Sequence, residues 1–195
     1  MNKIAIDIAL LLPSEIEDIC IDINNKYESS RPLKKDDYRT HITLAMGVIE
    51  KNKIKEITEW LQNINIPPID VIINKIKYTA PEGDNSSLEI MKSSELQTLH
   101  QTIINYIKQY LQKDASLEML YKGNETGITE NTKLWLDTFN DKTANNNYWP
   151  HITLNCHNAE TTLPLKFKAN TIALCHVGDG VTCRKILFEK NLTSN

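Results

Sequence analysis

The tetrapeptide His-Ile-Thr-Leu occurs twice in this chain of 195 residues, at residues 41–44 and again at residues 151–154. Ile and Thr are β-branched residues that fit extended backbone, so each copy predicts a strand. Side chains on a strand point alternately to its two faces. The His and Thr of each copy therefore share one face, and the Ile and Leu share the other.

Each copy carries side chains suited to phosphoryl transfer without a metal. If Ile and Leu point into the core, two such strands brought together would place two imidazoles and two hydroxyls around one small volume. Two histidines can remove a proton on one side of phosphorus and deliver one on the other near neutral pH. Threonine hydroxyls can donate hydrogen bonds to the non-bridging oxygens. We therefore interpret His41 and His151 as catalytic. Thr43 and Thr153 are the expected phosphate-binding residues.

A chance repeat is the simplest alternative, because short motifs give false positives. The content of the repeat argues against chance. Two of the five histidines occupy matched positions, each is followed by Thr at the same-face position, and one copy lies in each half of the chain. The functional interpretation is therefore favoured.

At these residues the chain resembles the 2H phosphoesterase superfamily, the LigT-like and 2′,5′ RNA ligase-like proteins named for two His-x-Thr/Ser motifs. The run Trp-Pro-His-Ile-Thr-Leu at residues 149–154 is similar to the second motif of that family. The resemblance implies an α+β fold of two pseudo-twofold lobes, with antiparallel sheets lining a central groove and helices outside. It also implies metal-independent cleavage or hydrolysis of 2′,5′-linked or 2′,3′-cyclic phosphodiesters, with no cofactor.

Two alternatives use the same groove. One is a non-catalytic module that binds a nucleotide or an RNA end. The other is a nuclease that degrades cyclic nucleotides or oligonucleotides of immune signalling. Paired His and Thr residues favour an enzyme over a binding module, because binding alone could use Lys or Arg. Either histidine could be the general base.

Length and charge indicate one domain with a small or single-stranded partner. With 41% hydrophobic residues the chain can bury a sizeable core. We expect one domain over residues 1–195, with lobes over about 1–92 and 93–195 and strands that could exchange between them. A net charge of -3 and a pI of about 6.0 argue against a long basic track for duplex nucleic acid. We expect the protein to be a monomer. Its expected partner is a nucleotide, an oligonucleotide or an RNA end.

The amino-terminal residues and the cysteines favour a cytoplasmic protein. Asp7 interrupts the first apolar run and no small-residue cleavage site follows, so a strand is predicted rather than a secretory signal. No stretch is long and apolar enough to cross a membrane. The cysteines at positions 20, 156, 175 and 183 lack metal-type spacing and are expected to be reduced. A disulfide between Cys175 and Cys183 across the last hairpin is the alternative.

Hydrophobic periodicity and turn residues predict the other elements. Ser14 and Glu17 are expected to form a capping box at the first helix. His100 borders the apolar stripe of a later helix and is expected to pack there. The polar segment 113–147, a departure from the family pattern, predicts a flexible loop or lid with a short helix at 132–139. Further strands are expected over 4–12, 70–79, 87–92, 165–177 and 181–189, and helices over 13–29, 51–64 and 94–112, with hairpin turns at 81–85 and 178–180.

Further side chains near the motifs are candidates for substrate binding. Aromatic residues there could stack a base, an interaction worth about 1–3 kcal/mol. His157 shares the face of His151 if its strand stays regular, and Trp135 and Tyr121 could close over a nucleobase. No metal site is predicted, because the sequence places no further ligands near these histidines. The candidates beside the motifs are Tyr38, Arg39, Tyr148, Trp149 and His157.

Overall fold

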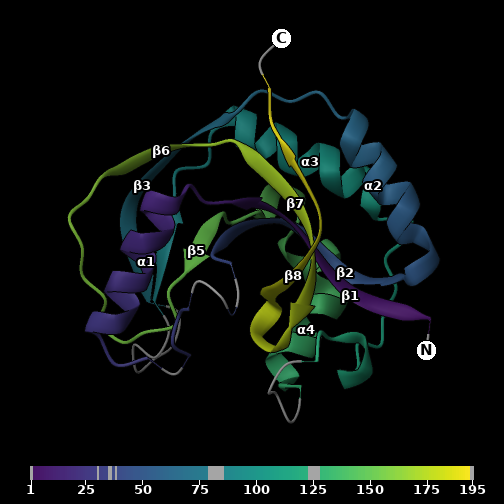
Figure 1. Ribbon diagram of the computed structural model, residues 1–195, viewed down its shortest axis with the longest axis horizontal. Coiled ribbons are helices and arrows are strands. Elements are labelled where there is room, and N and C mark those ends of the chain that lie inside the picture. Colours follow the sequence, from purple (N-terminus) through teal and green to yellow (C-terminus); the bar gives the residue numbers. More distant parts are fainter. Residues whose placement is uncertain are drawn as a thin grey trace.

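Two antiparallel sheets of four strands each form the framework of the protein. The computed structural model describes residues 2–29, 31–34, 37, 39–78, 86–122 and 128–193, with strand orders β2-β1-β7-β8 and β5-β4-β3-β6. In Figure 1, β1 and β2 run to the right, and β3, β5 and β6 lie on the left. The first sheet contains β1 (Lys3–Leu11), β2 (His41–Glu50), β7 (Thr171–Gly178) and β8 (Thr182–Asn191). The second contains β3 (Ile69–Tyr78), β4 (Ser86–Ile90), β5 (His151–Thr153) and β6 (Leu165–Ala169).

Each sheet combines strands from the two halves of the chain. The first takes β1 and β2 from before residue 93 and β7 and β8 from after it, and the second takes β3 and β4 from before and β5 and β6 from after. One His-Ile-Thr-Leu copy begins β2 and the other forms β5 and the residue after it. Each sheet therefore contributes one copy.

Helices pack against both sheets, and the chain crosses over to place them. α1 (Ser14–Lys26) follows β1 but lies on the side of the second sheet (Figure 1), where Asn24 Nδ2 donates a hydrogen bond to the carbonyl oxygen of Leu154. α3 (Ser94–Ile107) follows β4 and packs against β2 of the first sheet. α2 (Ile54–Asn63) contacts α3 through stacked aromatic rings. The protein thus has the α+β architecture that the resemblance implies.

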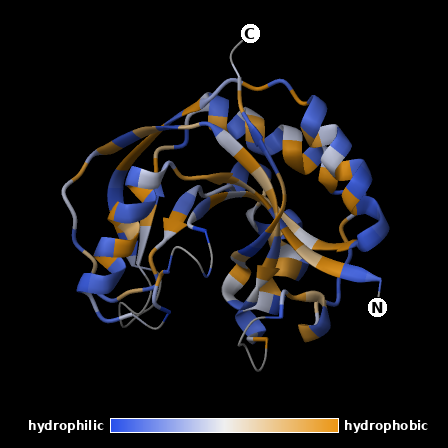
Figure 2. Cartoon of the chain, viewed as in Figure 1, coloured by the Kyte–Doolittle hydropathy of each residue, from blue (hydrophilic) through white to orange (hydrophobic). Residues whose placement is uncertain are grey.

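The apolar core runs through the central strands. β1 is buried along almost its whole length because β2 and β7 flank it and both of its faces are covered. In β2, Ile42 and Leu44 are buried whereas His41 and Thr43 are partly exposed, so the expected alternation is confirmed. Figure 2 shows apolar residues along these strands and hydrophilic residues on the outer helix faces. Asp7 is the exception, a carboxylate buried within β1.

The expected capping box at the start of α1 is wrong. Pro13 is the N-cap residue, so Ser14 lies one position too late to cap the helix. The hydroxyl of Ser14 donates to the carboxylate of Glu15 instead. Glu17 is buried, and its carboxylate lies 3.0 Å from the guanidinium of Arg39. Glu17 therefore forms an ion pair with the loop before β2 instead of the predicted cap. The helix also ends earlier than expected, before residue 29.

The expected strand over 165–177 divides into two. β6 pairs with β3, whereas β7 pairs with β1, so a break at Asn170 moves the chain from one sheet to the other. The expected hairpin of β7 and β8 is present. Its turn contains Gly180 at φ +70°, where an added Cβ would lie 1.8 Å from Nη1 of Arg31. The hairpin of β3 and β4 is present too, and its turn lies outside the described residues.

All four cysteines are buried and free. Cys175 and Cys183 pack in the same small buried cluster on the last hairpin, and their side chains interact. Both are nevertheless free, so the alternative of a disulfide between them is wrong for this structure.

The described part of the polar segment 113–147 consists mainly of helical turns that pack on the core, so the expectation of a loop there is wrong. α4 (Glu130–Thr138) contains most of the expected short helix and packs against β2, with Leu136 and Phe139 buried. The preceding helix ends at Ile107, earlier than expected. None of the described helices has the length and apolar character that a membrane crossing requires. Short helical turns lie at Lys51–Lys53, Leu117–Met119, Phe139–Thr143, Asn145–Asn147 and Asp179–Val181.

Candidate active site

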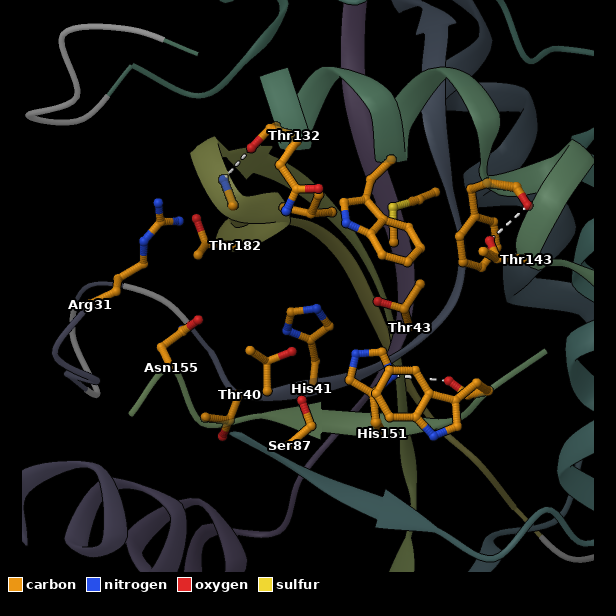
Figure 3. A pocket seen from close by; sticks show the side chains of 18 of the residues that line it. Arg31, Thr40, His41, Thr43, Ser87, Thr132, Thr143, His151, Asn155 and Thr182 are labelled. Atoms are coloured by element: carbon orange, nitrogen blue, oxygen red, sulfur yellow. Dashed lines mark hydrogen bonds between the residues drawn. The ribbon is translucent and has the colours of Figure 1, made fainter. Parts of the chain in front are cut away.

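The two His-Ile-Thr-Leu copies meet at one cavity of about 530 Å³. β2 brings His41 and Thr43 from the first sheet, β5 brings His151 and Thr153 from the second, and all four side chains line the cavity. Figure 3 shows the imidazoles of His41 and His151 beside each other. The structure thus brings together the four residues that the sequence pattern pairs.

His41 is engaged at both ring nitrogens. Nδ1 donates a hydrogen bond to the carbonyl oxygen of Arg39 at 2.9 Å, and Nε2 lies 3.3 Å from Oδ2 of Asp7. Burial disfavours the charged imidazole, but the hydrogen bond and charge of Asp7 outweigh burial and raise the pKa of His41 to about 9. Burial also raises the pKa of Asp7, against the hydrogen bonds from His41 and Thr43. The pair therefore retains a proton at neutral pH.

His151 has the same backbone contact and the opposite electrostatic surroundings. Its Nδ1 donates to the carbonyl oxygen of Trp149 at 2.9 Å, and the two rings stack with centroids 4.1 Å apart. The ammonium of Lys77 lies 4.2 Å from the centre of the Trp149 ring. Burial lowers the pKa of His151, and the charges of His41 and Lys77 act in the same direction. Nε2 has no hydrogen-bond partner among the described residues, so it can accept a proton.

The two threonines differ in what their hydroxyls contact. Thr43 donates to Oδ2 of Asp7 at 2.7 Å, the same oxygen that faces His41. The hydroxyl of Thr153 has no hydrogen-bond partner in the part of the chain that the structure describes. Ser87 lies opposite Thr153 in the sheet and also lines the cavity. Thr153 and Ser87 are therefore available to a phosphate oxygen as they stand.

The cavity has an aromatic wall and a polar end. Trp135 of α4 contributes to the wall. Arg31, Asn155 and Thr182 lie toward one end in Figure 3. Nη2 of Arg31 lies 3.0 Å from Oδ2 of Asp179, and this ion pair fixes the loop after α1 against the last hairpin. Such a cavity falls within the size range of small-molecule sites.

The structure places three of the other substrate-binding candidates in the cavity lining. Arg39 lines the cavity while its guanidinium pairs with a buried carboxylate of α1. Tyr148 is 4% exposed and stacks on a buried histidine of α3, and Trp149 stacks on His151. Tyr38 lies outside the described residues. Substrate binding by these residues stays a prediction.

His157 and Tyr121 do not line the cavity. His157 was expected to share the face of His151 only if its strand stayed regular. β5 instead ends at Thr153, and Asn155 has a left-handed backbone with φ 56°. The alternation of side chains stops there, so Asn155 lines the cavity and His157 does not. Tyr121 instead packs edge-on against His176.

Asp7 and Ser87 are site residues that the sequence patterns did not identify. The sequence did contain a signal for the role of Asp7, because a single carboxylate inside an apolar strand needs a buried partner. Ser87 had none, because only the register of β4 against β5 places it beside Thr153.

One group of side chains at the site could contact a metal ion. Ligand atoms of Asp7, His41 and Cys183 lie within 4.8 Å of one another, the only such group found among the described residues. Nitrogen, oxygen and sulfur ligands suit Zn²⁺. Burial raises the pKa of the Cys183 thiol, so an ion there would have to displace its proton.

Comparison with protein-family models gives no match, and comparison with curated proteins gives none. Solved structures do match over nearly the whole chain. E. coli LigT in its apo form has 16% identity and a TM-score of 0.61, covering 100% of both chains. E. coli LigT complexed with 3′-AMP has 18% identity and a TM-score of 0.61, covering 98% of this chain and 99% of that one. The protein TT0787 of Thermus thermophilus has 14% identity and a TM-score of 0.61, covering 98% of this chain and 100% of that one.

These similarities show the fold. The chain has a LigT-like fold, which is the architecture that the resemblance implies.

Proposed function

We propose that the protein is a metal-independent 2H-type phosphodiesterase that acts on 2′,3′-cyclic phosphates or on 2′,5′-linked nucleotides or RNA. The observation that carries the proposal is the convergence of His41 and His151 on one cavity from different sheets, each with a threonine beside it. One imidazole has a carboxylate at its Nε2 and the other has an unpartnered Nε2 within the described chain. An acid and a base are thus both available near neutral pH.

The electrostatics favour His151 as the base and His41 as the acid. With a 2′,3′-cyclic phosphate, water attacks phosphorus while its proton passes to Nε2 of His151. The bond from phosphorus to one ribose oxygen breaks, and that oxygen takes the proton from Nε2 of His41. Hydrogen bonds from Thr153 and Ser87 to the non-bridging oxygens would stabilise the charge that gathers there.

A 2′,5′-linked oligonucleotide would react by the same proton transfers. His151 takes the proton of the ribose 3′-hydroxyl, which attacks the neighbouring phosphorus. The departing 5′-oxygen takes the proton from His41, and the products are a 2′,3′-cyclic phosphate and a free 5′-hydroxyl. Neither route needs an electron acceptor or a metal.

Nucleotide substrates fit the cavity and its surroundings. A volume of about 530 Å³ falls in the range of small-ligand sites. The similar E. coli LigT has been solved in complexes with 3′-AMP and with ATP. The net charge of -3 favours a nucleotide or an RNA end over a long duplex. A monomer in the cytoplasm remains our expectation.

A substrate panel tests this proposal. Purified protein in EDTA is incubated with 2′,3′-cyclic mononucleotides, 2′,5′-oligoadenylate, 3′,5′-linked oligonucleotides and cyclic dinucleotides. The His41→Ala/His151→Ala double variant runs alongside, with His176→Gln as a control that alters a histidine outside the cavity. We expect wild type and His176→Gln to turn over 2′,3′-cyclic mononucleotides or 2′,5′-oligoadenylate. The double variant should turn over neither. Turnover of cyclic dinucleotides alone would favour a signalling nuclease, and binding without turnover would favour the non-catalytic module.

A further inference from the structure

Asp7 is a buried carboxylate that two-histidine chemistry does not by itself require. It lies in the middle of β1, opposite Met46 of β2 and Cys175 of β7, and its exposed fraction is 0%. Burying a carboxylate among apolar residues is strongly unfavourable unless the carboxylate is paired and hydrogen-bonded. The contacts that compensate Asp7 are therefore a requirement of its position.

These contacts reach Asp7 through one oxygen and from one motif. Oδ2 accepts a hydrogen bond from the hydroxyl of Thr43 at 2.7 Å and lies 3.3 Å from Nε2 of His41. Oδ1 has no partner within the part of the chain described. The carboxylate thus joins the His and the Thr of the first motif. Over the described residues, no hydrogen bond links it to the second motif.

We propose that Asp7 is the positioning residue of the general acid. Its Oδ2 holds the imidazole of His41 in the protonated form and keeps the hydroxyl of Thr43 beside it until a phosphate oxygen displaces the carboxylate from that hydroxyl. This inference rests on the proposed function for the identity of the acid. The coupling between Asp7 and His41 exists without substrate, so it can be measured separately.

Asp7 contributes most to stabilising the imidazolium of His41, ahead of the backbone carbonyl of Arg39 and of Cys175. Burial raises the pKa of the Cys183 thiol, which therefore stays uncharged near neutral pH. Protonation of His151 would add repulsion rather than attraction. Removing the charge of Asp7 should therefore remove the main stabilisation of the charged ring. The titratable groups that face His41 are Asp7 on β1, His151 on β5, Cys175 on β7, Cys183 on β8 and Arg39 in the preceding loop.

The test is a ¹⁵N NMR titration of the imidazoles in wild type, Asp7→Asn and Glu17→Gln. The His41 signal is identified by its loss in His41→Ala. Glu17 is a matched control, because it is another buried, ion-paired carboxylate near the first motif. We expect the midpoint of His41 to fall by at least about one pH unit in Asp7→Asn, a tenfold loss of proton affinity. Glu17→Gln should leave that midpoint unchanged.

An unchanged His41 midpoint in folded Asp7→Asn would overturn the proposal. If Asp7→Asn does not fold, the wild-type titration decides alone. A His41 midpoint above the ordinary histidine value of 6.5 supports the proposal, and one at or below 6.5 overturns it.

A leaving-group experiment tests the acid role in turnover. A nucleoside phosphodiester that releases an alcohol is compared with its p-nitrophenyl ester, whose leaving group needs no proton. We expect Asp7→Asn to lower kcat by roughly 10²-fold or more on the first substrate, to keep KM, and to recover on the second. His151→Ala should be defective on both.

Equal defects of Asp7→Asn on both substrates would overturn the acid role. Absence of wild-type turnover on both would count against the proposed function and leave the titration result standing.

Discussion

His41 and His151 each donate Nδ1–H to the carbonyl oxygen of the residue two positions earlier, which leaves Nε2 of each ring for other contacts. Nε2 of His41 faces Asp7, and Nε2 of His151 has no hydrogen-bond partner among the described residues. The same local geometry therefore arises twice from the same short sequence. What differs lies across the sheets: a carboxylate of β1 faces one ring, and a stacked indole with an ammonium beyond it faces the other. Long-range packing, rather than the motif, distinguishes the two rings.

The pH dependence of turnover should follow this difference. His151 must be neutral to act as a base, and its pKa is lowered, so kcat/KM should rise with pH and level off at or below about 6.5. His41 must be protonated to act as an acid, and its pKa is about 9, so the rate should fall as pH rises through that value. Measured rates between these limbs should be nearly constant. A rate that keeps rising beyond pH 9 would contradict the assignment.

Thr153 should contribute to the transition state as a hydrogen-bond donor. Thr153→Ala removes a hydroxyl that has no other partner in the described structure, so kcat should fall by about 10²–10³-fold, as for one lost oxyanion donor. Thr153→Ser keeps the hydroxyl and should retain most of the activity. Steady-state kinetics of the two variants checks this, and equal losses would show that the methyl group, not the hydroxyl, matters.

The sequence could predict the His and Thr pairs because their common face follows from the period of two within four residues. It could not assign a role to Asp7, whose partner Thr43 lies 36 residues away and meets it only through the pairing of β1 with β2. The same limit applies to Ser87 and Thr153. Residues within a motif are predictable, and residues that join it through sheet register are not.

At the scale of elements, α4 shows why the composition of the polar segment led to a wrong prediction of a loop. The position of this helix depends on polar contacts between residues that are distant in the sequence. Oδ1 of Asp179 accepts hydrogen bonds from the hydroxyls of Thr129 and Thr132 at 3.0 and 2.6 Å, and from the backbone N–H of Thr129. A segment rich in Thr and Asn reads as a loop when these partners are unknown. In the fold they attach α4 to the last hairpin as a wall of the cavity.

Trp135 on α4 should contribute to binding of the base. Its indole lines the cavity, and stacking of a base on an aromatic ring is worth about 1–3 kcal/mol. Trp135→Ala should therefore raise KM by roughly 5- to 150-fold with little change in kcat. Leu134→Ala, on an exposed position of the same helix, is the control. A loss in kcat without a change in KM would show that Trp135 does not hold the base.

At the scale of the whole molecule, the sheets are assembled from strands that the sequence could not pair. The predicted strands and helices mostly exist near their expected positions, because each has its own apolar pattern. The single residue between β6 and β7 gave no sign that the chain changes sheets there. Pairing depends on which edges meet in three dimensions, and local patterns carry no information on that choice.

His100 links three parts of this assembly and should matter for stability. Its Nδ1 donates to the carbonyl oxygen of Leu44 at 2.7 Å, and its Nε2 accepts from the backbone N–H of Asn145 at 2.8 Å. His100→Leu leaves both backbone groups unpaired, so the free energy of unfolding should fall by about 1–3 kcal/mol per group. Urea denaturation measures this loss.

The same histidine predicts a pH dependence of stability. Burial lowers the pKa of His100 below 6.5, so its contribution is present above pH 6.5 and is lost as pH falls through the folded-state value. Wild type should therefore lose more stability than His100→Leu between about pH 7.5 and about pH 5. Equal losses in the two proteins would show that other groups cause the decline.

The central claim is that two histidines carry out phosphodiester chemistry without a metal. The most direct measurement compares kcat of wild type, His41→Ala and His151→Ala, each in EDTA, on the substrate class that the panel identifies. We expect wild type to be unaffected by EDTA and each variant to lose roughly 10²–10⁴-fold. A wild-type enzyme that EDTA inactivates, or a single-histidine variant that keeps the wild-type rate, would contradict the account.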